Sequence, residues 1–468
     1  MHHHAHILLL ALIIFTLIPL QAGAPPLLGP MVAVVSKKEA KTSQKKTPNK
    51  KNKKAPKKRA RLPKKRVPAT AEEGEEKNVG DGIKEMGEDI KDFGEQMVMR
   101  IDRLIKQKSF TFLGDPWTVQ GIPIFFPARN TGVHLGVHIM MNNIRRQDPH
   151  KAQFMGQVLA SDQGQLKHFI QLDLPRAFNG NFRIRGRAAL DRDLQQRYFG
   201  LSNETTVDRN AAYQNALVYQ NIRHQPSFTL EFLKRFGRNL LIGPVLGLKW
   251  STITAPAGSL LAQQAPAGVN GGRTHYFGLA IIDDRTDFEP YPSRGSAHEL
   301  FLVFYNRILG SDYDFFRGTY EYRQYWPLHR TLTLAHRTFF ETLNGNVPYY
   351  EMGATGGLNR TLGFGGSRFL RGYFENQFVG NLKLAMSLEL RWDPLTFNMA
   401  RQVFTLGFVP FLDFGRVWNT DRPLTFGPWH ASTGWGIRAI WNHRFILRGD
   451  FAMNSEGTNV YVEIGNHF

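Results

Sequence analysis

The sequence predicts an all-β protein: a 16-stranded antiparallel transmembrane β-barrel with an inward-folded loop between strands 11 and 12, preceded by a short amphipathic helix. Three observations predict this fold. Beyond the N-terminal region there is no run of roughly 18 apolar residues, which excludes a membrane-spanning helix there. From Trp117 onward, short segments alternate apolar and polar residues between turn residues. The chain also has 44 Gly, 35 Phe, 14 Tyr and 8 Trp, which suit turns and the aromatic girdles of such barrels.

Residues 1–24 have the pattern of a signal peptide. An apolar run from Ile7 to Leu20 is followed by the small residues Ala22, Gly23 and Ala24, which are typical of a cleavage site. We therefore expect export to the bacterial outer membrane, with the N-terminal extension in the periplasm. Histidines at positions 2–4 and 6 should be removed with this segment, so they predict no metal site.

Residues 25–71 are predicted to be a disordered linker rich in Lys and Pro. Residues 36–68 contain 16 Lys or Arg and the single acid Glu39, and they supply most of the net charge of +20. Either this is a solvated spacer, or residues 37–66 bind an anionic envelope polymer. Nucleic-acid binding is not expected, because no aromatic residues are interleaved with the basic ones and the chain is exported.

Residues 72–107 are predicted to form an amphipathic periplasmic helix. Its apolar residues recur at a spacing of three to four: Ile83, Met86, Ile90, Phe93, Met97, Ile101 and Leu104. The helix could pair with a partner helix, cover the periplasmic mouth of the barrel, or simply pack on the barrel.

Residues 115–468 are predicted to form the barrel itself. Between Asn381 and Trp392, apolar residues occupy every second position and polar or small residues the others, as a strand between lipid and water requires. The sixteen expected strands span roughly 117–125, 132–143, 152–161, 166–174, 181–190, 225–235, 239–252, 274–284, 296–307, 314–325, 330–341, 378–392, 402–415, 432–442, 444–453 and 458–468. An even count places both ends in the periplasm, with the four longest connections outside, as in outer-membrane barrels.

The last strand carries an expected assembly signal formed by Val462, Ile464 and Phe468. Alternation places these residues and Val460 on the lipid face. A terminal aromatic residue on such a strand resembles the signal that the barrel-assembly machinery reads during biogenesis.

The residue types argue against catalysis. There are no cysteines, so disulfides, thiolate chemistry and Cys-ligated metals are excluded. His298-Glu299 lacks the second histidine of a zinc helix motif, and phosphate loops and nucleophile elbows are absent. We therefore predict no catalytic residues, no metal and no cofactor.

Several motifs resemble the BamA-type surface-antigen superfamily, which includes barrel-assembly factors and two-partner secretion translocators. The central one is Leu370-Arg371-Gly372-Tyr373, in the long connection before the twelfth expected strand. Further matches follow in the right order over about residues 115–468: Tyr198 to Asn203, Asp283 to Thr286 with Pro292 and Gly295, Glu389 to Arg391, Phe411 to Gly415, Gly434 to Arg438 and Arg448 to Asp450.

The resemblance implies that the connection folds back into the lumen and that Arg371 meets acids on the barrel wall. Alternation places Asp413 and Glu389 inward, so both are candidate partners. Gly372 and Tyr373 complete the predicted loop site, because glycine lets the backbone approach the wall closely. The inward alternation also predicts lumen-facing charge at Arg391, Arg438, Arg448 and Asp450.

Three functions remain open at this stage. The resemblance implies translocation or insertion of a client polypeptide or lipid among outer-membrane lipids, with lateral opening between the first and last strands. The alternatives are a pore lined by the inward charges and an envelope tether that uses the basic linker. About 90 residues separate the signal from the barrel, without the repeated βααββ pattern of the family's POTRA domains.

Overall fold

The computed structural model describes residues 108–112, 115–128, 132–143, 152–214, 216–357, 363–399, 402–419, 426–442 and 445–468. The predicted signal peptide, linker and amphipathic helix lie outside these residues. Within the part of the chain that is described, no helix is long and apolar enough to cross a membrane.

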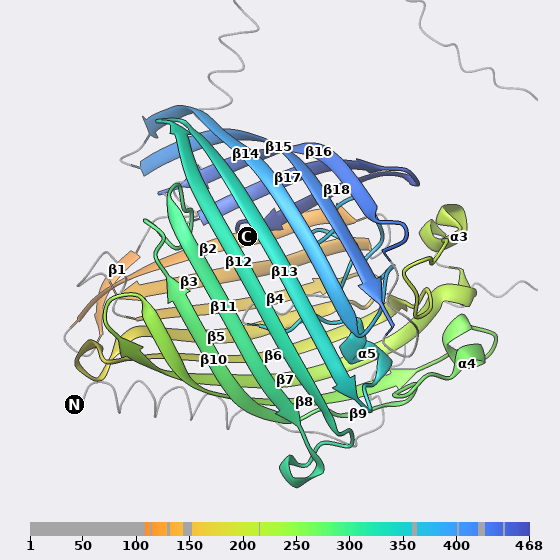
Figure 1. Cartoon of the computed structure of the whole chain (residues 1–468). Coiled ribbons are helices and arrows are strands. Elements are labelled where there is room, and N and C mark those ends of the chain that lie inside the picture. The colour runs from red at the N-terminus through yellow and green to blue at the C-terminus, as the bar shows by residue number, and fades with distance from the viewer. Residues whose placement is uncertain are drawn as a thin grey trace, which may run out of the picture. The chain divides into compact units, whose positions relative to one another are not determined.

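One antiparallel sheet dominates the structure, and it curls so that β10–β15 lie in front of β2–β8 (Figure 1). Its eighteen strands are β1 (Lys108–Phe112), β2 (Asp115–Ala128), β3 (Gly132–Asn143), β4 (Gln153–Ser161), β5 (Leu166–Ala177), β6 (Phe182–Arg197), β7 (Gln220–Phe236), β8 (Leu240–Thr254), β9 (Gly271–Arg273), β10 (Tyr276–Asp284), β11 (Gly295–Tyr305), β12 (Phe315–His329), β13 (Leu332–Gly345), β14 (Leu382–Met399), β15 (Gln402–Trp418), β16 (His430–Trp441), β17 (Phe445–Asn454) and β18 (Gly457–Ile464).

Successive strands pair from β1 to β8 and from β10 to β18, and β8 pairs with both β9 and β10. Among the described residues, no ladder joins β18 to β2. Each of the sixteen predicted ranges overlaps one strand, and the described part of the sheet has two further strands. The additional strands, β1 and β9, are only five and three residues long, which is too short for alternation to reveal them.

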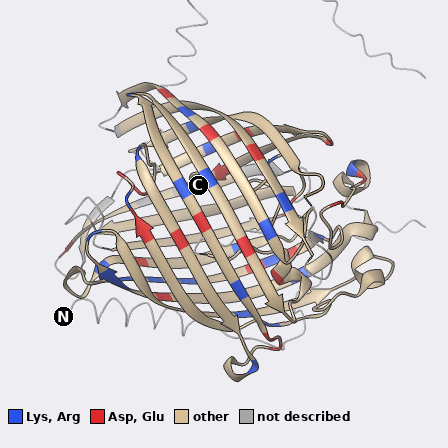
Figure 2. Ribbon diagram, in the orientation of Figure 1, with Lys and Arg blue, Asp and Glu red and all other residues tan. Residues whose placement is uncertain are grey.

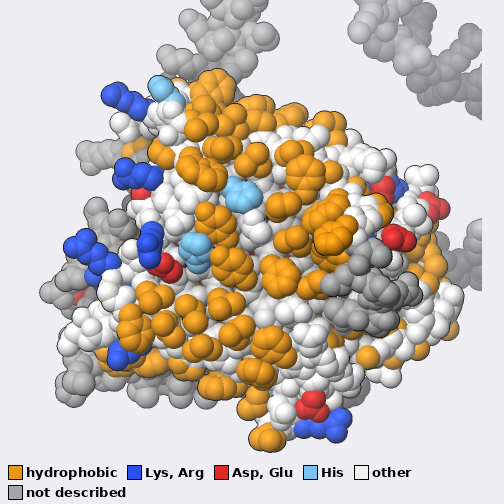
Figure 3. Space-filling view, in the orientation of Figure 1, with side chains coloured by type: hydrophobic (Ala, Val, Ile, Leu, Met, Phe, Trp, Pro, Cys, Tyr) orange, Lys and Arg blue, Asp and Glu red, His pale blue; other side chains and the backbone are white. Residues whose placement is uncertain are grey.

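The two faces of the sheet differ as alternation requires. On β15 the side chains of Thr405, Val409 and Asp413 are buried, whereas Leu406 and Phe408 are exposed on the other face. Hydrophobic side chains cover much of the outer face in Figure 3, and the charged residues of that view gather mainly toward its edges. Figure 2 shows that acidic and basic residues nevertheless occur in the middle of many strands. Several of them are fully buried, for example Arg317, Glu341 and Glu389.

The helices among the described residues are short and lie in the connections between strands. They are η1 (Phe178–Gly180), α3 (Arg209–Tyr213), η2 (Leu217–Tyr219), α4 (Leu260–Gln264), η3 (Arg307–Leu309) and α5 (Tyr349–Met352). Of these, α3, α4 and α5 lie at one end of the strands (Figure 1). The connection that contains α5 continues into the predicted Arg371 loop.

Candidate functional site in the connection between β13 and β14

The connection of residues 346–381 folds into a compact loop, of which 346–357 and 363–381 are described. An antiparallel bridge pairs Phe364 with Phe378 at its base. Within it, the main-chain N–H groups of Gly365 and Gly366 donate to the carbonyls of Phe369 and Tyr373, each at 3.0 Å. Gly365 and Gly366 both have positive φ, so glycine suits the tight reversal here.

Aromatic and aliphatic side chains hold this loop against the sheet. Phe364 stacks on Phe369, with ring centroids 5.3 Å apart, and Phe369 packs on Phe339 of β13. The whole buried cluster consists of Phe339, Phe364, Phe369, Leu370, Tyr373, Phe378, Ala385 and Val417. These side chains are buried between the loop and the sheet. Burial of their apolar area stabilises the loop in this docked position.

Arg371 sits at the tip of the loop and is completely buried. Its Nε and Nη2 donate to the two carboxylate oxygens of Asp413 at 2.8 and 2.9 Å, a bidentate pair. Its Nη1 donates to Glu389 at 2.9 Å and lies 3.5 Å from Asp450. Its guanidinium also lies 3.4 Å from the centroid of the Phe411 ring. Burial alone would lower the pKa of Arg371, but Asp413, Glu389 and Asp450 together raise it, so the cation stays charged. We call these four charged residues the Arg371 anchor.

Three further arginines surround the acids of this anchor. Arg391 donates to Glu389 at 3.0 Å, and Arg438 and Arg448 donate to Asp450 at 2.5 and 2.6 Å. All three are at most 2% exposed. The predicted lumen-facing charges thus lie on the buried face of the sheet. Arg448 also donates to the loop at the Ser367 carbonyl, and Arg391 donates to the C-terminal Phe468 carbonyl, each at 3.1 Å.

The neighbours of Arg371 connect the loop to β18. Gly372 donates its N–H to the Tyr461 hydroxyl at 3.0 Å, and its carbonyl accepts from Asn459 Nδ2 at 2.6 Å. Its φ of 101° lies in the region that favours glycine. The Tyr373 hydroxyl reaches the Ala431 carbonyl of β16 at 3.3 Å. The structure therefore brings all five residues of the predicted loop site together.

A second charged contact, which the sequence analysis missed, lies near the start of the connection. Glu351 of α5 accepts from Lys249 Nζ of β8 at 2.6 Å, from Arg317 Nη2 of β12 at 3.0 Å and from Thr274 Oγ1 at 3.0 Å. Glu351 and Arg317 are completely buried. We call this contact the Glu351 anchor. It reverses the polarity of the first one, because here the loop supplies the acid and the wall supplies the cations.

The C-terminus corrects one expectation. Val460 and Val462 are 69% and 52% exposed on the outer face of β18, as predicted. Phe468 does not share that face, because β18 ends at Ile464 and the chain turns at Gly465, whose φ is 101°. Phe468 is instead 8% exposed and packs in a buried cluster with Tyr325 and Ala335, and its carbonyl accepts from Arg391 at 3.1 Å.

The Tyr198–Asn203 motif also meets the connection. The Phe199 ring lies 5.5 Å from that of Phe374, and the Ser202 carbonyl accepts from the main-chain N–H of Val379 at 3.4 Å. Asn203 Oδ1 accepts from the N–H of Val417 on β15 at 3.0 Å. Motifs far apart in the sequence therefore converge on the same loop.

Comparison with known proteins places this chain in one protein family. A family model described as the Omp85 superfamily domain matches residues 191–468. Similar solved structures include BamA from Haemophilus ducreyi lacking POTRA domains 1–3, at 13% identity and a TM-score of 0.49 over 78% of this chain and 76% of that one. They also include CdiB from Escherichia coli, at 13% identity and a TM-score of 0.45 over 74% of this chain and 62% of that one. A bacterial polysaccharide outer membrane secretin matches at 9% identity and a TM-score of 0.36 over 74% of this chain and 94% of that one. No curated protein matches.

Proposed function

Because this chain belongs to the Omp85 superfamily of outer-membrane β-barrels, we propose that it inserts or translocates a protein or lipid client at the bacterial outer membrane. On this proposal, the sixteen strands β2–β8 and β10–β18 close into a barrel whose seam lies between β2 and β18. The connection 346–381 then lies inside the barrel, and the client passes or leaves when the connection is displaced.

The observation that carries this proposal is the Arg371 anchor together with its link to β18. Arg371 joins acids on β14, β15 and β17, and the adjacent Gly372 exchanges hydrogen bonds with Tyr461 and Asn459 of β18. A displaced loop would withdraw these contacts from β18, the strand at the proposed seam. Movement of the connection and opening of the seam are thereby coupled through identified hydrogen bonds.

The anchor also sets what a client has to supply. Removing Arg371 separates it from the buried Asp413, while Glu389 keeps Arg391 and Asp450 keeps Arg438 and Arg448. Breaking the buried Arg371–Asp413 pair costs about 3–5 kcal/mol. A client that binds the docked and displaced states equally well shifts nothing. It must therefore bind the displaced state more tightly, for example by pairing its own edge strand with β2 or β18.

The surroundings of the barrel complete the proposal. Outer-membrane lipids contact the exposed apolar face, and the barrel-assembly machinery folds the chain during biogenesis. The N-terminal extension lies in the periplasm, where its basic segment 37–66 meets anionic envelope polymers or acts as a spacer.

The test is an insertion assay in liposomes that contain the refolded full-length protein. The probe is a small, urea-unfolded eight-stranded outer-membrane barrel, whose folding is followed by its shift in gel mobility. We expect the wild type to accelerate folding over empty liposomes and Arg371→Ala to lose most of that acceleration. Arg307→Ala is the matched control, because Arg307 pairs with Asp314 in an exposed connection, and it should behave as wild type. Equal folding rates with wild-type and empty liposomes would refute the insertion role.

A further inference from the structure

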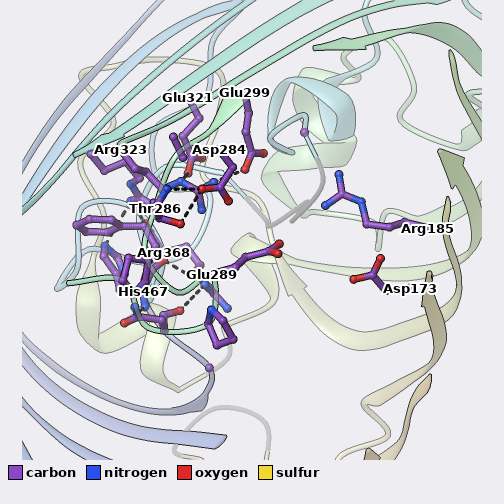
Figure 4. Close-up of a pocket in the computed structure, with 18 of the residues that line it drawn as sticks. Asp173, Arg185, Asp284, Thr286, Glu289, Glu299, Glu321, Arg323, Arg368 and His467 are labelled. Carbon is purple, nitrogen blue, oxygen red and sulfur yellow. Dashed lines mark hydrogen bonds and ion pairs between the residues drawn. The ribbon is translucent and has the colours of Figure 1, made fainter. Parts of the chain in front are cut away.

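Two cavities of about 490 and 500 Å³ remain beside the docked connection. The first is bordered by the connection between β10 and β11 and by the C-terminal residues. In Figure 4, Arg185 and Asp173 lie on one side of it, across from Glu299, Glu321 and Arg323. The second extends along the inner face of β4–β7 to Gln165, in the turn between β4 and β5. Neither cavity is lined by a residue of the Arg371 anchor.

The two cavities share part of their lining, and we call these shared residues the neck. The described residues that border both cavities include Arg185, Arg187 and Arg368 and no carboxylate. Away from the neck both cavities are lined by acids as well as by bases, and Arg183, for example, is paired with Asp173 and Glu289. The neck therefore differs from the chambers on either side of it.

The partners of these arginines leave positive charge at the neck. Arg185 is paired with Glu231 at 2.7 Å. Arg187 instead donates to the amide oxygen of Gln171 at 3.0 Å, and its guanidinium lies 3.9 Å from the centroid of the Phe169 ring.

Arg368 donates to the main-chain carbonyls of Asn466 and His467 at 2.8 and 3.1 Å, with Glu463 only at 3.7 Å. Glu463 is shared with Arg448, which it meets at 2.9 Å, and a neutral amide or carbonyl cancels no charge, so the residues of the neck carry more positive than negative charge.

We propose that the docked protein retains a water-filled path for small inorganic anions such as chloride, selected at the neck by Arg187 and Arg368. Rings of Arg or Lys select anions in pores because they lower the energy of an anion at the narrowest point. This path is independent of client insertion, since it runs beside the loop and does not require its release. Arg368 belongs to the connection itself, so release of the connection would remove one side of the neck and abolish the selectivity.

The test is the reversal potential of the refolded full-length protein in planar bilayers under a KCl gradient. The wild type should show a steady small conductance that prefers chloride. Arg187→Glu changes the charge at the neck by two units, which at roughly 5 Å in water disfavours chloride and favours potassium by about 17-fold each, so the chloride-to-potassium permeability ratio should fall on the order of a hundredfold. Arg187→Gln changes the charge by one unit and should lower this ratio on the order of tenfold. It replaces the glutamate variant if that variant does not refold.

The matched control is Arg192→Glu. Arg192 lies on β6, as Arg187 does, and its replacement by glutamate changes the charge by the same two units. Unlike Arg187, it borders only the second cavity. Its effect on the ratio should be well below that of Arg187→Glu. A wild type without steady conductance, a preference for potassium, or equal shifts in the two glutamate variants would overturn the proposal.

Discussion

Replacement of Glu351 by glutamine measures the strength of the Glu351 anchor. The carboxylate is completely buried and accepts from Lys249 and Arg317, both of which are themselves buried. Glutamine preserves the size of the side chain and one acceptor oxygen, but it removes the carboxylate that Lys249 contacts and leaves Arg317 with Glu341 alone, 3.9 Å away. Breaking a buried ion pair in this way costs about 3–5 kcal/mol. Because the amide oxygen can still accept one hydrogen bond, we expect the free energy of unfolding to fall by about 3 kcal/mol.

The assay is equilibrium unfolding of the refolded protein in urea, followed by tryptophan fluorescence. Glu204→Gln is the control, since Glu204 is an exposed acid in another connection, and its loss should stay within about 0.5 kcal/mol. A double-mutant cycle with Lys249→Met should give a coupling energy of about 1–3 kcal/mol. A loss below about 1 kcal/mol for Glu351→Gln would refute the argument that both cations depend on this carboxylate.

Four further substitutions test the loop site and the C-terminus by the same unfolding assay. Arg371→Lys keeps the charge but loses the bidentate geometry, and it should cost about 2 kcal/mol; an unchanged midpoint would show that charge alone suffices. Gly372→Ala places a Cβ at a φ of 101° and should cost about 1–3 kcal/mol, whereas a neutral effect would mean that the loop relaxes. Phe468→Ala removes the packing on Tyr325 and should cost about 3 kcal/mol; no cost would contradict its burial. Burial and neighbouring arginines lower the pKa of His467 well below its ordinary 6.5. Below about pH 6.5 the unfolded chain therefore binds the extra proton, and stability should fall by up to about 1.4 kcal/mol per pH unit. His467→Gln should flatten this slope, and identical slopes would rule out His467 as its source.

The strands were predictable because their physical signal is local. Alternation depends only on neighbouring residues, and it placed Asp413 and Glu389 on the face where the structure has them, beside Arg371. Asp450 was recognised as inward, but its contact with Arg371 depends on the register of β14–β17, which no local pattern reveals.

The Glu351 anchor could not be predicted in the same way. Glu351 is a single acid in an irregular connection, and its partners Lys249 and Arg317 come from strands more than thirty residues away along the chain. The only available signal was a Lys and an Arg at inward positions of β8 and β12. Phe468 was misplaced because alternation was extended past Ile464, beyond the turn at Gly465.

The two anchors of opposite polarity lie twenty positions apart in one connection, at residues 351 and 371. If each resists opening by about 3 kcal/mol, either one alone is open for roughly one part in 150 of the time. When the two open independently, these probabilities multiply, and both are open together for only about one part in twenty thousand. Spontaneous fluctuation would then rarely free the whole connection, although each end samples the open state often enough for a ligand to capture it. The connection would therefore be released faster if a ligand captured its two ends one after the other.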